Sequence, residues 1–284
     1  MKHLVFFSGG AGSYSATKRV LENVDKEDLH LLFTDTQIED QELYRFMIDA
    51  LEKSYEVVLE DERQLVSVLT ATEVDLDKRK RELYNIQSRV NAKIPNMHWI
   101  RYEVDGVGVD PWSIFYNDRF IGNSRIARCS TIIKQRLARD YVRDNFEKDD
   151  LIVYLGIDWM EVHRSKVPRE NWSKFASDVR FPMCEEPYLL KDDIVKIIEL
   201  DGIRIPTPYL QGASHLNCGG FCVRGGQGHF ARLLQINPEL FEYHATKERD
   251  LNELIQNEKG SDEKYSILKH AVAGETTSLT LDDL

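Results

Sequence analysis

Glycine and serine residues follow the first apolar segment of the chain in an order that suits the binding of phosphate. His3–Phe7 is rich in β-branched and aromatic residues, which predicts a strand, and apolar residues recur at helical spacing from Ser13 to Asn23. A strand that turns through glycine into a helix offers free backbone N–H groups and the positive end of the helix dipole to an anion. The residues that we expect to form this phosphate-binding loop are Ser8, Gly9, Gly10, Gly12, Ser13 and Ser15.

Two polar residues stand at the end of a second predicted strand, Leu29–Thr34. Asp35 and Thr36 follow it directly, and a predicted helix, Asp40–Ser54, comes next. In a doubly wound sheet, ligands bind at the carboxyl ends of the parallel strands, so these residues are expected to lie beside the first loop and to contact the same ligand. The alternative is that they cap the following helix.

Three of the four cysteines form a candidate metal site. Cys218 and Cys222 are separated by Gly-Gly-Phe, and the glycines allow a tight loop that turns two thiolates toward one metal. Cys129 opens a predicted helix and is expected to meet them at the ligand edge of the sheet. Thiolates with His215 would suit Zn²⁺, and free structural thiols are the alternative. Cys184 is expected to pack in the core.

The glycine loop resembles the signature of the PP-loop, or ATP pyrophosphatase, superfamily, which is Ser-Gly-Gly-x-Asp-Ser after the first strand. Gly12 stands where the superfamily has Asp. The resemblance implies a fold like that of the adenine nucleotide alpha hydrolases, with ATP or a related adenine nucleotide and Mg²⁺ as ligands. The matching residues are Ser8, Gly9, Gly10 and Ser13.

The resembling families also carry Asp-Thr at the end of the second strand, followed by an acidic residue such as Glu39 here. The resemblance implies that Asp35 replaces the missing Asp near the metal. It also extends to Gly156–Arg164, which is similar to the glycine-led strand end of the phosphoadenosine-phosphosulfate reductase family, and to Tyr209–His215, which leads into the cysteine loop. These matches imply nucleotide binding by Gly156.

The cysteines resemble two branches of this superfamily. Iron–sulfur reductases have a Cys-Cys pair before a helix containing Lys, whereas here Cys129 is followed by Ser130 and then by Lys134. Three cysteines resemble instead the PP-loop tRNA thiolases, so a [4Fe-4S] cluster is implied as the alternative to Zn²⁺. The metal ligands would be Cys129, Cys218 and Cys222, and the catalytic residues Asp35, Lys134 and Arg164.

The function implied is ATP-dependent adenylation of a substrate with release of pyrophosphate. We expect sulfur transfer, or thiolation, to a nucleic acid or a small acceptor, with a sulfur donor as a further partner. Resembling reductases use a mobile C-terminal cysteine, which the tail Ala271–Leu284 lacks. Reduction of phosphoadenosine or adenosine phosphosulfate is therefore an alternative. A second alternative is a nucleotide-binding regulatory or scaffold protein that lost catalysis with the Asp at Gly12.

The strands and helices that position these residues alternate along the sequence. This alternation predicts an α/β fold with a doubly wound, mostly parallel sheet. Residues 1–235 are expected to form the nucleotide-binding domain with an insertion at about residues 70–125, either a lid or a packed aromatic subdomain, and residues 236–284 a helical C-terminal extension. Further strands are expected at Tyr55–Leu59 and Leu151–Gly156, and further helices at Thr131–Asn145 and Asp192–Leu200.

The net charge and the lengths of the apolar stretches limit the classes of partner that the protein can bind. The chain has 284 residues and a formal net charge of −11, which argues against a broad surface that holds nucleic acid nonspecifically, although a local basic groove remains open. No apolar stretch approaches the roughly 20 residues that cross a bilayer. We therefore expect a soluble, cytoplasmic protein with no membrane partner. The sequence leaves the oligomeric state open.

Overall fold

Five parallel strands form the central sheet. The computed structural model describes residues 1–69, 76–122, 126–212, 216–260, 262–272 and 275–284. The spatial order is β3-β2-β1-β6-β7, so the connections run outward in both directions from β1. The ends of β1 and β6 therefore lie where the winding reverses, which is where such sheets bind ligands. The strands are β1 (Lys2–Phe6), β2 (Leu29–Asp35), β3 (Met97–Arg101), β6 (Leu151–Tyr154) and β7 (Asp178–Arg180).

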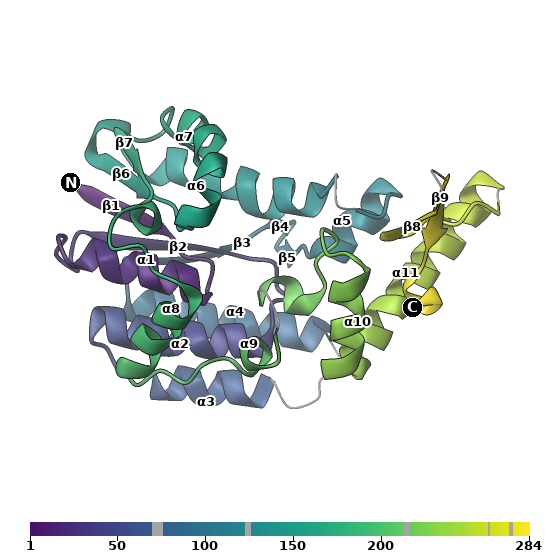
Figure 1. Cartoon of the computed structure of the whole chain (residues 1–284), viewed down its shortest axis with the longest axis horizontal. Coiled ribbons are helices and arrows are strands. Elements are labelled where there is room, and N and C mark those ends of the chain that lie inside the picture. The colour runs from purple at the N-terminus through teal and green to yellow at the C-terminus, as the bar shows by residue number, and fades with distance from the viewer. Residues whose placement is uncertain (70–75, 123–125, 213–215, 261, 273–274) are drawn as a thin grey trace.

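The largest hydrophobic core lies on one side of this sheet. Val5, Leu31 and Phe33 point to this side at every second position of their strands and are buried against Phe46 and Met47. Figure 1 shows the helices that cover this side. They are α1 (Ala11–Leu21), α2 (Gln41–Tyr55), α3 (Glu60–Leu69), α4 (Leu76–Lys93) and α8 (Lys191–Leu200).

A smaller core covers the opposite side of the sheet. Leu4 and Leu32 occupy the alternate positions of β1 and β2 and pack with Val142 and Phe146. The helices on this side are η1 (Ser130–Arg136), a π-helical turn that continues into α6 (Leu137–Asn145), and α7 (Lys166–Trp172). Both faces are covered, and β6 and the greater part of β2 are accordingly apolar and buried.

A third core lies beside the sheet and is built mainly from the C-terminal part of the chain. Trp112, Phe221, Phe230 and Leu281 are buried in it. Figure 1 shows its outer end as a helix and an antiparallel hairpin. The elements are α5 (Pro111–Asp118), α10 (Gln227–Ile236), α11 (Pro238–Lys259), β8 (Leu268–Val272) and β9 (Glu275–Leu279).

A buried carboxylate ties the hairpin and the chain terminus to α11. Glu248 accepts hydrogen bonds from the backbone N–H groups of Ile267 (2.9 Å) and Leu281 (2.6 Å). Short elements complete the fold: β4 (Glu103–Val104), β5 (Val107–Gly108), η2 (Lys148–Asp150), η3 (Trp159–Ser165), η4 (Pro182–Cys184), α9 (Thr207–Leu210), η5 (Asn217–Gly220) and η6 (Leu281–Asp283).

The predicted α/β class with a parallel sheet is confirmed, but one predicted strand is wrong. Tyr55 is the last residue of α2, and Glu56 ends that helix in the left-handed conformation (φ 55°), so Tyr55–Leu59 forms no strand. The third strand is β3, which lies inside the segment predicted as an insertion at about residues 70–125. That segment therefore supplies the edge of the central sheet and the crossover helix α4.

The C-terminal extension is helical in α11, as expected, but it also contains the hairpin of β8 and β9, which the sequence pattern did not predict. Leu281 is buried and Leu279 packs against the same core, so these two leucines dock the tail. Among the described helices, none is both long and apolar enough to cross a membrane.

Candidate functional site

The glycine loop has a conformation that few other residues could adopt. Gly9 has a φ of +73°, and a Cβ atom there would lie 2.6 Å from Cδ2 of the buried Leu43. Gly10 is extended and forms the N-cap of α1. The Ser13 hydroxyl donates to the Gly10 carbonyl at 2.8 Å and lies 3.2 Å from the Ser8 hydroxyl. The loop is therefore a turn, fixed by its own hydrogen bonds, that leads into a helix N-terminus, as its sequence predicts.

Two other loop residues differ in what they offer to a ligand. The Ser15 hydroxyl donates to the Ala11 carbonyl at 3.1 Å and is almost fully buried, so it faces the helix and not the loop. Gly12 has no atom within 4 Å of the place where a Cβ would stand. The position therefore has room for the carboxylate that the resembling superfamily carries there.

A cleft of about 460 Å³ opens at the carboxyl ends of β1, β2 and β6. Its charged lining is entirely basic among the described residues, with Lys134, Arg139 and Arg164. Much of its wall is apolar and includes Phe6, Leu155 and Trp172. A net charge of −11 makes a cleft without carboxylates unusual for this chain, and the lining suits an anionic ligand that also has a flat apolar part. The other polar residues of the lining are Ser8, Thr34, Gln135 and Asn171.

The three cations come from three elements that line the cleft. Lys134 lies in η1 and Arg139 in α6, whereas Arg164 lies in η3. Arg164 is exposed and pairs with Glu161 at 2.5 Å. Arg139 makes no ion pair or hydrogen bond with the described part of the chain. Its charge is thus available to a ligand.

Lys134 connects the cleft to a buried carboxylate. Its ammonium is 3.0 Å from Oε1 of Glu39, which is 0% exposed, while 28% of the Lys134 side chain is exposed. Burial lowers the pKa of Lys134, but the Glu39 carboxylate opposes burial, and the net shift is upward. Lys134 therefore stays charged at neutral pH. A π-helical turn carries it, and such turns recur at functional sites.

Gly156 brings the end of β6 against the glycine loop and the start of α1. A Cβ atom at this position would lie 3.6 Å from the Gly12 carbonyl oxygen and 3.6 Å from Cα of Ser13. The backbone after β6 therefore lies directly against the backbone after β1, at the point where the winding of the sheet reverses. The structure thus brings together the loop, Gly156, Lys134 and Arg164.

Asp35 lies in the core and not on the cleft, contrary to the expectation that it faces a metal. One carboxylate oxygen accepts from the Tyr44 hydroxyl at 2.7 Å and from the Gln37 amide at 2.6 Å, and the other accepts from Trp99 Nε1 at 2.9 Å. Burial raises the pKa of Asp35, although these hydrogen bonds oppose it. Thr36 is equally buried, and its hydroxyl has no hydrogen-bond partner in the described part of the chain.

The three predicted metal ligands do lie near one another. Each of the Cys129, Cys218 and Cys222 thiols is within electrostatic range of the other two. Burial raises the pKa of Cys129 and of Cys218, so both are protonated at neutral pH. The Cys218 backbone N–H donates to Glu39, and Cys218 itself is left-handed, with a φ of 56°. Glu39 thus contacts the cysteine loop and Lys134 with its two carboxylate oxygens.

The thiols have the right chemistry for Zn²⁺ or a cluster, but their arrangement does not form a ligand set. Within the described residues, no group of three His, Cys, Asp or Glu side chains is placed to hold a metal ion. His215, the predicted fourth ligand, lies outside the described residues. Cys184 is separate and donates to the Ile157 carbonyl at 3.2 Å. The metal site stays a prediction.

Several residues of the site were not singled out from the sequence. Arg139 and Trp172 line the cleft only because α6 and α7 face each other, and no local pattern indicates that. The hydroxyl oxygen of Tyr209 would lie 3.1 Å from a Cβ atom on Gly10, and this position beside the loop was not predicted from the sequence. A scan against protein-family models gives no match, and a search of curated proteins gives none either.

Proposed function

We propose that this chain is a PP-loop enzyme that binds an adenine nucleotide in the cleft between β1 and β6 and adenylates a substrate with release of pyrophosphate. One observation carries the proposal: a glycine loop at a helix N-terminus opens onto a cleft whose charged lining, among the described residues, is basic alone. The loop and the cations suit the phosphates, and the aromatic and aliphatic walls suit the base. The lining and the position at the winding reversal support the same ligand.

Catalysis at such a site would depend on positioning and on stabilising charge. Attack of a substrate oxygen on the α-phosphorus builds negative charge on the phosphate oxygens and on the leaving pyrophosphate. Lys134, Arg139 and Arg164 are the fixed positive charges available to it. No described carboxylate lines the cleft, because Gly12 replaces the expected Asp and Asp35 is buried. We therefore assign no protein ligand to Mg²⁺ and no step to it.

The thiols support sulfur transfer as the overall reaction. Lys134 lines the cleft and also acts electrostatically on Cys218 and Cys222, so an adenylated substrate would lie close to the cysteine loop. A nucleic acid or a small molecule would serve as the acceptor. All four cysteines are unpaired, which favours a reducing compartment such as the cytoplasm.

Nucleotide binding tests the first part of the proposal. In calorimetry, Arg139→Gln should weaken ATP binding roughly tenfold, because a charge-assisted contact to phosphate is lost. Arg143→Gln is the matched control, since Arg143 lies one helical turn further along α6, pairs with Asp140 at 2.8 Å and is absent from the lining. Equal effects of the two substitutions, or no ATP binding by the native chain, would reject the cleft as the nucleotide site.

Product analysis tests the reaction. With ATP and an acceptor, the chain should release pyrophosphate, and AMP should follow when a sulfur donor is added to displace it from the adenylated acceptor. With phosphoadenosine phosphosulfate and thioredoxin, it should release no sulfite. Sulfite production would favour the reductase alternative, and nucleotide binding without any turnover would favour a regulatory or scaffold role.

A further inference from the structure

Tyr209 covers the amide groups that a phosphate would need. Its hydroxyl accepts from the backbone N–H of Ala11, the first residue of α1. A Cβ atom on Gly10 would lie 3.1 Å from that hydroxyl oxygen. The lining of the cleft includes Ser8, at the start of the same loop, but none of Gly10, Ala11 and Tyr209. The side chain thus occupies the first N–H group of α1, which stands at the end of the loop that opens onto the cleft.

The contact resembles the one that a phosphate oxygen would make, but it is weaker. The first N–H groups of a helix have no partner within the helix and are natural donors to an anion. Burial raises the pKa of Tyr209, so its hydroxyl is neutral. A neutral oxygen accepts a hydrogen bond about half as strong as one to a charged oxygen. A nucleotide phosphate can therefore displace the hydroxyl, at the cost of one hydrogen bond.

The segment that carries Tyr209 is a short strap held at both ends. It is α9, with Pro206 before it and Gly212, in the left-handed conformation (φ +85°), after it. At its start, the Thr207 backbone N–H donates to Glu42 at 3.2 Å. At its end, Arg232 donates to the Gln211 carbonyl at 2.7 Å. Both anchors lie outside the loop that Tyr209 covers.

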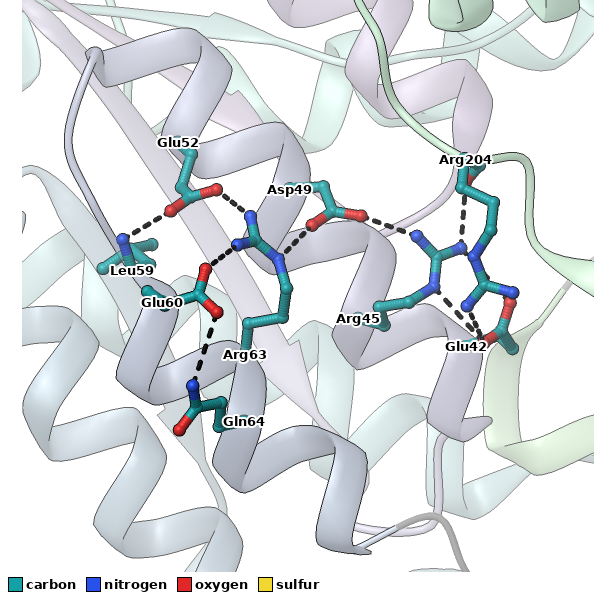
Figure 2. Close-up of polar contacts among 9 residues, drawn as sticks. All are labelled: Glu42, Arg45, Asp49, Glu52, Leu59, Glu60, Arg63, Gln64 and Arg204. Atoms are coloured by element: carbon teal, nitrogen blue, oxygen red, sulfur yellow. Dashed lines mark hydrogen bonds and ion pairs between the residues drawn. The ribbon is translucent and has the colours of Figure 1, made fainter.

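The anchor at the start belongs to a ladder of charges on α2 and α3, which Figure 2 shows. Arg204 pairs with Glu42 at 2.8 Å, and the Arg204 carbonyl accepts from Arg45 at 2.9 Å. Arg45 pairs in turn with Asp49 at 2.6 Å, and Asp49 pairs with Arg63 at 2.9 Å. The ladder therefore fixes the strap to the body of the domain, so that movement of Tyr209 is confined to α9.

We propose that α9 is a strap that competes with the nucleotide for the phosphate loop, with the Tyr209 hydroxyl in the place that a phosphate oxygen takes. The inference rests on the proposed function, because it concerns the same loop. It makes Tyr209 a residue that limits affinity and the rate of phosphate binding. A ligand without phosphate does not compete with the strap.

Tyr209→Phe tests this without removing the aromatic ring that packs against the core. Titration of the full chain with ATP and with inorganic pyrophosphate should show both ligands binding roughly fivefold more tightly to the variant, since displacement no longer breaks a hydrogen bond. Adenosine, which has no phosphate, should bind equally to both proteins. Tyr188→Phe is the control, because Tyr188 is an exposed tyrosine that contacts Trp159 and not the loop.

The outcomes separate this inference from the proposed function. If the native chain and Tyr209→Phe both fail to bind ATP, the proposed function fails. If both bind ATP equally, the strap alone is rejected. Weaker ATP binding by Tyr209→Phe would also reject it, because the hydroxyl would then be a ligand contact. Arg204→Gln, which removes an anchor of the strap without touching the loop, should raise the association rate of pyrophosphate, and an unchanged rate would contradict the role of the ladder.

Discussion

Replacing Lys134 with methionine should destabilise the protein through the charge that it leaves behind. The Glu39 carboxylate is fully buried and, within the described part of the chain, has only the backbone N–H of Cys218 and the ammonium of Lys134 as partners. Removing one member of a buried ion pair costs about 3–5 kcal/mol. Because 28% of the Lys134 side chain is exposed and water reaches the pair, the lower end, about 3 kcal/mol, is expected.

Glu39→Gln identifies the source of that loss. The glutamine side chain is uncharged and of similar size, so the double variant removes both charges and should be about 2 kcal/mol more stable than Lys134→Met alone. Urea unfolding followed by far-UV circular dichroism would measure the four proteins, with m values compared to check that the unfolded states are alike. Lys26→Met is a control, since the Lys26–Glu56 pair is exposed.

The reasoning is refuted if the two substitutions are additive, because the coupling between Lys134 and Glu39 would then be absent. It is also refuted if Lys134→Met costs no more than Lys26→Met. Either result would mean that the Glu39 carboxylate has another partner in the native protein.

Two further predictions concern the loop and the sheet. Gly9→Ala should lower the free energy of unfolding by about 3 kcal/mol, because it combines a left-handed φ with a clash against Leu43. Gly12→Ala, which meets open space in a helix, should leave the free energy of unfolding unchanged or raise it by about 0.5 kcal/mol. The midpoints of urea unfolding compare the two variants. Burial lowers the pKa of His98 to about 4, so the unfolded chain binds more protons between pH 6.5 and 4 and stability should fall as the pH is lowered through that range. His98→Phe should remove about 2 kcal/mol of the loss between pH 6.5 and pH 5, and an unchanged pH profile would contradict it.

Much of the fold could be predicted because the first two βαβ units carry their own local signals. Leu29–Asp35 is almost wholly buried, and an apolar run of that length between turns is typical of a central parallel strand. The prediction of the third strand was wrong because its local sequence signal is weak. Tyr55–Leu59 has β-branched residues, but Tyr55 ends α2 and the rest of the segment connects that helix to α3. Met97–Arg101 contains His and Arg and depends on pairing with β2 for its place. Tertiary contacts decided between the two.

The candidate site was predictable where chemistry is local and not where it depends on distant partners. The loop Ser8–Ser13 follows from one strand, its glycines and one helix. The pairing of Glu39 with Lys134 joins residues 95 positions apart, and nothing near either residue indicates it. Asp35 was misplaced because an Asp at a strand end looks the same in sequence whether it faces solvent or, as here, Tyr44 and Trp99. The hairpin of β8 and β9 was missed because its apolar alternation is short.

The strand order has a consequence for how the chain becomes functional during its synthesis. β1 lies in the middle of the sheet, yet its neighbour β6 is far along the chain; His3 and Tyr154, 151 positions apart, hydrogen bond across this pair. A ribosome adds roughly 5–20 residues per second, so β1 waits on the order of ten seconds for β6 to emerge. During that interval the open edge of β1 is a site where a chaperone can bind. A ligand of the cleft cannot assist the early stages of folding, because the cleft is completed only when β6 joins β1.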